Sequence, residues 1–137
     1  MACWLMKTEP GDYAWEQLVR DGRTLWNGVR NHQAANNLRA MRAGERAFFY
    51  RSVVEPAIVG VMRVTREAYP DPGDPDGRWV VVEVAPERPV PREVSLKAIR
   101  AEPRLADLAL VRQSRLSVVP VSEAHWRILA EMAGLEP

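Results

Sequence analysis

Short apolar runs separated by turn residues are the main pattern of this chain, and they predict strands. The run near the N-terminus ends in Thr-Glu-Pro-Gly, a turn sequence, and the longest run alternates in the manner of a half-buried strand. We predict strands over residues 3–7, 47–51, 57–68, 79–84 and 116–121. Residues 69–77 hold three prolines and are predicted to form a loop, and the proline-rich residues 86–91 to form a connection.

Apolar residues at helical spacing, several of them preceded by capping side chains, predict the helices. The predicted helices cover residues 13–20, 31–42, 95–100, 105–110 and 123–133. Asp12, Ser95 and Ser122 are the expected N-caps, because their oxygens can accept from free N–H groups of a first turn. Helices and strands do not alternate regularly, so a doubly wound parallel sheet is not expected. The pattern favours an α+β fold, with a curved, mostly antiparallel sheet or barrel flanked by helices, in one domain over residues 1–137.

The composition is typical of a soluble globular protein. Of 137 residues, 47% are hydrophobic and 27% are charged, which suits a single domain with a core. The longest aliphatic run, residues 57–62, is too short to span a bilayer, and the N-terminus lacks signal-peptide features. Cys3 has no second cysteine for a disulfide, and the histidines, His32 and His125, are scattered. We expect a cytoplasmic protein with no membrane partner, metal or cofactor.

The net charge of +1 predicts no particular partner, but the charges are unevenly distributed. Residues 23–51 carry six arginines and one acid, Glu45, whereas residues 67–93 carry seven acids and three arginines. A basic face is one property of proteins that bind polyanions. A solvated face balanced by acids elsewhere in the fold explains the pattern at least as well, and we favour it on charge alone.

The segment 26–41 has the composition of a recognition surface. It begins with Trp26, has Gly28 two residues later, and continues with asparagines and arginines that a core does not need. An aromatic ring can stack on a planar ligand, amides can bind its polar edge, and arginine binds anionic oxygens. We predict that Trp26 forms a platform for a ligand, with packing in the core as the alternative. Asn36 and Asn37 are better explained as partners of backbone groups.

Catalytic motifs are not evident in the sequence. It contains no phosphate-binding glycine loop, nucleophile elbow or paired-cysteine motif. Glu9 could act as a general acid or base beside an aromatic pocket, but a turn residue that binds backbone explains it better. Residues 50–52 and 112–115 offer hydroxyl and guanidinium donors suited to phosphate or carboxylate, with strand packing and surface ion pairs as the alternatives.

Several long strings, in order along the chain, resemble the EVE domain family of the PUA-like superfamily. They are Trp4-Leu-Met-Lys7-Thr-Glu-Pro10, Trp26-Asn-Gly-Val-Arg-Asn-His-Gln-Ala34, Asn37-Leu-Arg-Ala-Met41, Phe48-Phe-Tyr50-Arg-Ser52, Glu67-Ala-Tyr-Pro-Asp71 and Leu110-Val-Arg-Gln-Ser-Arg-Leu-Ser-Val118. The resemblance covers nearly the whole chain. Besides Thr8 for Ser, which keeps the hydroxyl, it departs from the usual family pattern in four places: Asn27 for Asp, His32 for Tyr, Ala35 for Arg and Arg51 for His. These changes bear on base preference and not on the fold.

The resemblance implies a PUA-like pseudobarrel that binds modified bases without catalysis. The expected ligand is 5-methylcytosine or an oxidised derivative, in DNA in preference to RNA, flipped into an aromatic pocket. A restriction or nuclease partner is a further expectation from the family. The alternatives are a module for small anionic ligands or modified RNA and, less favoured, an enzyme acting on nucleotides.

The expected site residues fall into three groups. Those expected to contact the base are Trp26, Asn27, Gly28, Val29, Arg30, Asn31, Tyr50 and Ser52. Those expected to bind phosphate are Lys7, Arg51, Arg112 and Arg115, and Arg30 would add to them. Thr8, Glu9 and Pro10, in the turn after the first strand, are further candidates for the pocket wall.

Overall fold

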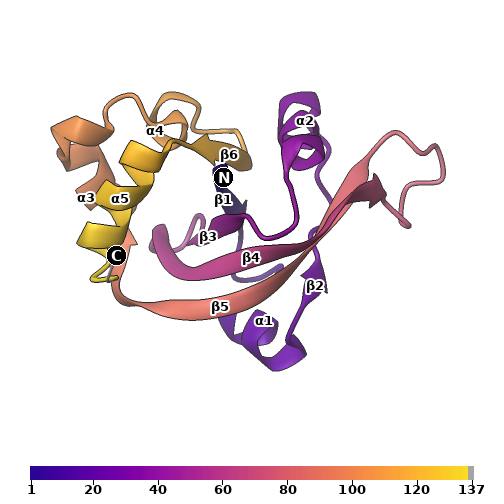
Figure 1. The fold of residues 1–137 in the computed structure, drawn as a ribbon, viewed down its shortest axis with the longest axis horizontal. Helices are drawn as coiled ribbons and strands as arrows, with labels where there is room; N and C mark the ends of the chain where they lie inside the picture. Colours follow the sequence, from indigo (N-terminus) through magenta and orange to yellow (C-terminus); the bar gives the residue numbers. More distant parts are fainter. Residues whose placement is uncertain (136–137) are drawn as a thin grey trace.

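One curved, six-stranded sheet organises the chain. A computed structural model describes residues 1–135 and gives the strand order β2-β5-β4-β3-β1-β6 (Figure 1). The strands are β1 (Cys3–Thr8), β2 (Thr24–Leu25), β3 (Arg46–Arg51), β4 (Ala57–Pro70), β5 (Val80–Ser95) and β6 (Val118–Val121). β1 pairs with β3 in parallel, and every other strand pair is antiparallel. The predicted α+β class with a mostly antiparallel sheet is confirmed.

The helices flank this sheet. They are α1 (Trp15–Asp21), α2 (His32–Ala40), α3 (Leu96–Ala101), α4 (Ala109–Arg112) and α5 (Glu123–Met132), with a 3₁₀ turn, η1, at Pro103–Leu105. In Figure 1, α1 and α2 lie on opposite sides of the sheet, while α3, α4 and α5 gather near one end. None of the helices within residues 1–135 is long and apolar enough to cross a membrane.

Aromatic contacts on both faces of β3 join the sheet to its surroundings. Successive side chains of a strand point to opposite faces. Phe48 stacks on Trp126 of α5, with ring centroids 3.8 Å apart and planes 15° apart. The next residue, Phe49, meets Trp15 of α1 and Trp26 edge-on, at 5.4 and 5.7 Å. The buried core therefore extends through both sides of the sheet, and Trp26 belongs to it.

Local capping determines where several helices begin. The predicted N-caps Ser95 and Ser122 are confirmed, because their side chains accept hydrogen bonds from the N–H groups of Ala98 and His125. The prediction that Asp12 caps the first helix is wrong. That helix begins at Trp15, and the N–H at its start, on Ala14, donates to the Gln17 side chain at 2.7 Å.

Several other predicted strands and helices need corrections, most of them within residues 79–121. β5 begins after Trp79 and runs through residues 86–91, which were predicted to connect rather than to pair. β2 pairs with β5 only at Glu83 and Val84, so residues 86–91 lie beyond this pairing, in an edge position that tolerates proline. The short β2 was not predicted at all. Other boundaries also moved: β4 extends to Pro70, α2 ends at Ala40, the predicted helix 105–110 is replaced by η1 and α4, and β6 begins at Val118.

The uneven charge distribution is resolved by pairing across the fold. Five of the six arginines in residues 23–51 lie within 4 Å of an acid from residues 67–93, in the pairs Arg23–Glu83, Arg30–Asp71, Arg42–Glu67, Arg46–Glu87 and Arg51–Glu93. The favoured interpretation, a basic segment balanced by acids elsewhere, is thereby supported. Most of these pairs are at the surface, where each contributes about 0–1 kcal/mol.

Candidate functional site

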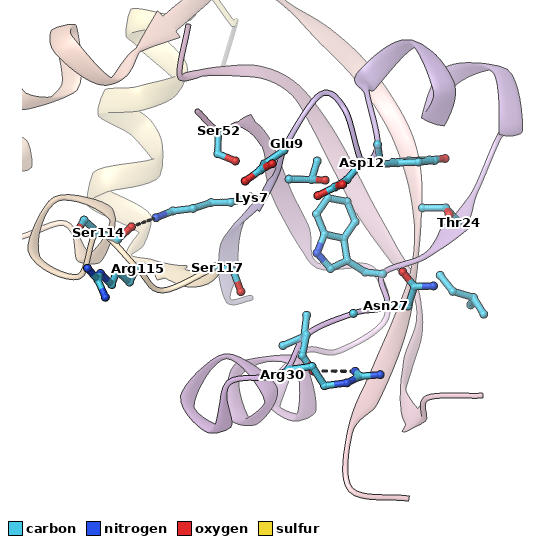
Figure 2. A pocket seen from close by; sticks show the side chains of 16 residues that line it. Lys7, Glu9, Asp12, Thr24, Asn27, Arg30, Ser52, Ser114, Arg115 and Ser117 are labelled. Atoms are coloured by element: carbon cyan, nitrogen blue, oxygen red, sulfur yellow. Dashed lines mark hydrogen bonds between the residues drawn. The ribbon is translucent and has the colours of Figure 1, made fainter. Parts of the chain in front are cut away.

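A cavity of about 660 Å³ lies where β1 and β3, the parallel pair, end side by side. The ends are joined by a hydrogen bond of 2.9 Å from the Ser52 N–H to the Thr8 carbonyl. Segments from three other parts of the chain, within residues 9–13, 24–30 and 114–117, complete the walls. The lining residues are Lys7, Thr8, Glu9, Asp12, Tyr13, Thr24, Leu25, Trp26, Asn27, Gly28, Val29, Arg30, Ser52, Ser114, Arg115 and Ser117 (Figure 2).

Lys7 connects two walls of the cavity. Its Nζ donates to the Ser114 carbonyl at 3.0 Å, the dashed line on the left of Figure 2, and its backbone N–H donates to the Ser117 carbonyl at 2.9 Å. Partial burial lowers the pKa of Lys7. An ammonium group has three donors, so two remain for a ligand on this side of the cavity, where Arg115 also lies.

The segment from Trp26 to Arg30, here called the inner loop, forms the opposite wall. The Trp26 N–H donates to the Val82 carbonyl at 2.8 Å, which fixes the start of the loop on β5. Gly28 has φ +78°, a left-handed conformation that glycine adopts without steric cost. Trp26 is only 7% exposed and Val29 5%. The alternative for Trp26, packing in the core, is therefore confirmed, and the same side chain also lines the cavity.

A buried carboxylate, Asp71, holds the inner loop in place. It accepts a hydrogen bond from Arg30 Nη1 at 3.1 Å and another from the Gly73 N–H at 2.8 Å. Burial alone would raise the pKa of Asp71, but the bonds from Gly73, Arg30 and the Gly28 N–H outweigh it and keep the pKa below its usual value. Asp71 is thus a charged anchor beneath the loop.

Carboxylates and hydroxyls give the cavity both hydrogen-bond acceptors and donors. Glu9 and Asp12 belong to one tight turn, in which the Asp12 N–H donates to the Glu9 carbonyl at 2.9 Å. Figure 2 shows both side chains above Lys7, with Ser52 beside Glu9 and Thr24 beyond Asp12. The site can therefore satisfy a planar ligand that carries donors on one part of its edge and acceptors on another.

Ten of the fifteen predicted site residues meet at this cavity. They are Lys7, Thr8, Glu9, Trp26, Asn27, Gly28, Val29, Arg30, Ser52 and Arg115. Tyr50 is 3% exposed and borders a smaller depression that shares Lys7 and Ser52 with the cavity. Pro10 lines another depression, beside Trp15 and Phe49.

The remaining three predicted residues are engaged elsewhere in the fold. Asn31 is the N-cap of α2 and accepts from the Ala34 N–H at 2.9 Å. Arg51 pairs with Glu93 and with backbone carbonyls, and Arg112 lies 3.2 Å from Asp107. Asn36 bonds to Arg39, and the Asn37 amide donates to the Val118 carbonyl. The prediction that these two asparagines bond to backbone groups is confirmed for Asn37 and wrong for Asn36, whose partner is a side chain.

Sequence reasoning missed six residues of the cavity wall: Asp12, Tyr13, Thr24, Leu25, Ser114 and Ser117. For Asp12 and Tyr13 a signal was available, since they follow the candidate turn directly. Ser114 lies inside the donor cluster that had been noted, and Ser117 two residues beyond it. The pair Thr24 and Leu25 forms a two-residue strand, for which the sequence carries no periodic signal.

Comparisons with known proteins place this geometry in context. The family model described as the EVE domain matches residues 2–132. Human thymocyte nuclear protein 1 is 32% identical over 98% of this chain and 75% of that protein. An NMR structure of a Rhodopseudomonas palustris protein has a TM-score of 0.94 at 46% identity, covering 100% of this chain and 97% of that one.

Two further structures bear on ligand and fold. Human THYN1 protein was crystallised in complex with DNA containing 5-methylcytosine; it is 32% identical, with a TM-score of 0.90 and full coverage of both chains. A YTH domain from Zygosaccharomyces rouxii has a TM-score of 0.62 at 12% identity, covering 96% of this chain and 86% of that one. The second likeness shows that the predicted PUA-like fold is correct.

Proposed function

The chain belongs to the EVE domain family, and on that premise we propose that it is a non-catalytic module that binds a modified base of nucleic acid. The ligand is 5-methylcytosine or an oxidised derivative, in DNA in preference to RNA. One observation carries the proposal: the cavity combines the Trp26 wall with polar groups from separate parts of the chain. The related human protein in complex with 5-methylcytosine DNA supports the choice of ligand.

The size of the cavity fits a single base that has left its stack. A volume of about 660 Å³ lies within the usual range of sites for small molecules. A base inside a duplex cannot reach such a site, so the protein binds it flipped out of the helix. Stacking of a base on an aromatic side chain contributes about 1–3 kcal/mol, and Trp26 lines the cavity next to Asn27 in the sequence.

The polar groups match the edge of cytosine. Its exocyclic amine is a donor, for which Asp12 or Glu9 is the natural acceptor. Asn27 and Ser52 supply donors for the ring nitrogen and carbonyl. Val29 offers an apolar contact for a methyl group at the 5-position. In this arrangement an unmodified cytosine keeps its hydrogen bonds and loses only the contact with Val29, so we expect preference rather than absolute selection.

The cations across the cavity from the inner loop are expected to bind phosphate. Lys7 and Arg115 both line the cavity, and Arg115 has no ion-pair partner among residues 1–135. A small number of phosphate contacts gives affinity that falls as salt rises.

A matched pair of asparagine variants tests the proposal. Asn27 lines the cavity, whereas Asn36 is exposed on α2 and bonds to Arg39. Asn27→Ala should weaken binding of a duplex with one 5-methylcytosine by about tenfold, since a lost hydrogen bond to a ligand costs about 1 kcal/mol or somewhat more. Asn36→Ala should bind as wild type does. Equal effects of the two changes would show that the ligand does not enter this cavity.

The non-catalytic part of the proposal has a separate test. Modified duplex incubated with the protein and analysed by mass spectrometry should be recovered unchanged. A product of altered mass would contradict it, and Glu9→Gln and Asp12→Asn would then identify the carboxylate responsible.

A further inference from the structure

The loop that follows β3, Ser52 to Pro56, here called the outer loop, exposes two valines beside the cavity. Val53 is 69% exposed and Val54 59%. Besides them, the large apolar side chains exposed within residues 1–135 are Met1 and Val19. Exposed apolar residues that stand singly need no explanation, whereas these two are adjacent at one loop tip.

The backbone of the outer loop is strained at the same place. Val53 has φ +71° and Glu55 has φ +46°. A positive φ is unusual for any residue other than glycine and is a true outlier for a β-branched one. Such a conformation persists only where the surrounding structure holds it.

Arg51 holds the strained loop closed. Its Nε donates to the carbonyls of Val54 and Glu55, each at 3.1 Å, and its Nη2 donates to the Glu55 carbonyl at 2.8 Å. The guanidinium also forms two hydrogen bonds with the Glu93 carboxylate, at 3.1 and 2.7 Å. The valines therefore stand on a clamped tip whose conformation is set before any partner arrives.

The tip adjoins the candidate site and the cations Lys7 and Arg100. Ser52 lines the cavity, and Val53 borders a depression of about 210 Å³ that it shares with Lys7, Ser52, Ser114 and the exposed Arg100. Arg100 has no ion-pair partner among residues 1–135. A duplex whose base enters the cavity thus brings its stack and its phosphates against this loop.

We propose that the outer loop is a wedge that inserts Val53 and Val54 into the base stack of a duplex and occupies the place of the extruded base. Apolar side chains inserted between base steps are a recurrent way to keep a duplex opened. The inference rests on the proposed function, because it assumes that the cavity takes the base. It adds a contribution to affinity that only a double-stranded partner supplies, since a single strand has no duplex stack that must be kept open.

The double variant Val53→Asn, Val54→Asn tests the wedge. Asparagine tolerates the left-handed region better than valine, so the fold should be retained, which thermal unfolding checks. Val19→Asn, the same change at an exposed valine of α1 that does not line the cavity, is the matched control. Affinities are measured for a duplex and for a single strand that carry the same 5-methylcytosine, and 2-aminopurine next to that base reports unstacking by its fluorescence.

The wedge predicts a split between the two nucleic acids. The double variant should bind the duplex about tenfold more weakly, because apolar contact is lost, and should bind the single strand as wild type does. The 2-aminopurine fluorescence of the bound duplex should also fall in the double variant. Val19→Asn should change neither the duplex affinity nor this fluorescence. Unchanged duplex binding, or equal losses for duplex and single strand, would overturn the wedge alone. A wild-type protein with no preference for the modified base in either form would instead overturn the proposed function, and the wedge with it.

Discussion

The inner loop, Trp26–Arg30, and the outer loop, Ser52–Pro56, are both held by an arginine paired with a carboxylate, yet they direct their apolar side chains oppositely. In the inner loop, Arg30 pairs with Asp71, whose side chain is 3% exposed, and Trp26 packs into the core beside the cavity. In the outer loop, Arg51 pairs with Glu93, which is 55% exposed, and the valines face solvent. An arginine in a recognition segment can thus be structural, while its neighbours make the contacts.

Replacing an apolar residue of each loop should expose this difference most strongly. Trp26→Ala is expected to lower the free energy of unfolding by about 3–5 kcal/mol, because it leaves a hole against Phe49. Val54→Ala should change it by less than about 0.5 kcal/mol, since the side chain is at the surface. Chemical denaturation measures both. Similar small costs would mean that Trp26 is not part of the core.

The buried anchor of the inner loop gives the next largest effect. Asp71→Asn should cost about 1–3 kcal/mol of stability, because the ion pair with Arg30 is lost in a buried site. It should also reduce preference for the modified base, since Gly28 and Arg30 lose their common partner. Asp76→Asn is the control, because the Asp76 side chain accepts no hydrogen bond from residues 1–135. A stable variant with intact base preference would show that the inner loop keeps its conformation without Asp71.

Acid should separate the two anchors further. The pKa of Asp71 is lowered in the fold, and so is that of Glu93, chiefly through its hydrogen bonds with Arg51. A carboxylate whose pKa is lower in the folded than in the unfolded protein stabilises the fold at pH values above the unfolded pKa. This contribution is lost as the pH falls, here below about pH 5. Unfolding measured across this range should be less pH-dependent in Asp71→Asn than in wild type. Glu93→Gln should alter the pH dependence less, because solvent screens an exposed pair, and the reverse order would refute this ranking.

Arginine-to-lysine exchange tests whether Arg51 is a clamp or a phosphate ligand. Its ion pair contributes only about 0–1 kcal/mol to stability. As a clamp it requires the planar fork of the guanidinium, so Arg51→Lys and Arg51→Ala should both weaken binding to a methylated duplex. Full binding by the lysine variant would indicate that only the positive charge matters.

The smallest expected effects concern two nearby arginines. Arg115→Ala should reduce the slope of log affinity against log salt by about 1, as expected for one lost phosphate contact. Arg112→Ala should leave the slope unchanged, because Arg112 is engaged with Asp107 and does not line the cavity. Titrations at several salt concentrations decide between them, and an unchanged slope for Arg115→Ala would move the phosphate path elsewhere.

Short-range features of this fold could be predicted from the sequence, and long-range ones could not. Ser95 and Ser122 cap their helices through bonds to residues three positions on, which a sequence displays directly. Arg30 and Arg51 bond to carboxylates 41 and 42 residues away, and nothing local indicates such partners.

The same distinction explains which residues of the candidate site the sequence did not reveal. The inner loop was recognisable because an aromatic, a glycine and amides lie together in the sequence. Thr24 and Leu25 escaped notice because only their pairing with β5 makes them a strand and brings them to the cavity. Asn31 was assigned to the ligand because its capping role and a reading role call for the same polar side chain.

The most direct test is titration of the protein's tryptophan fluorescence with duplexes that differ only in one cytosine: unmodified, methylated or hydroxymethylated. Trp26→Phe, which retains an aromatic wall of smaller area, serves as the companion variant. The account predicts tighter binding of a modified duplex by the wild-type protein and a reduced preference in Trp26→Phe. Equal, salt-sensitive binding of all three duplexes would contradict it and leave only a charged surface that binds DNA without reading its bases.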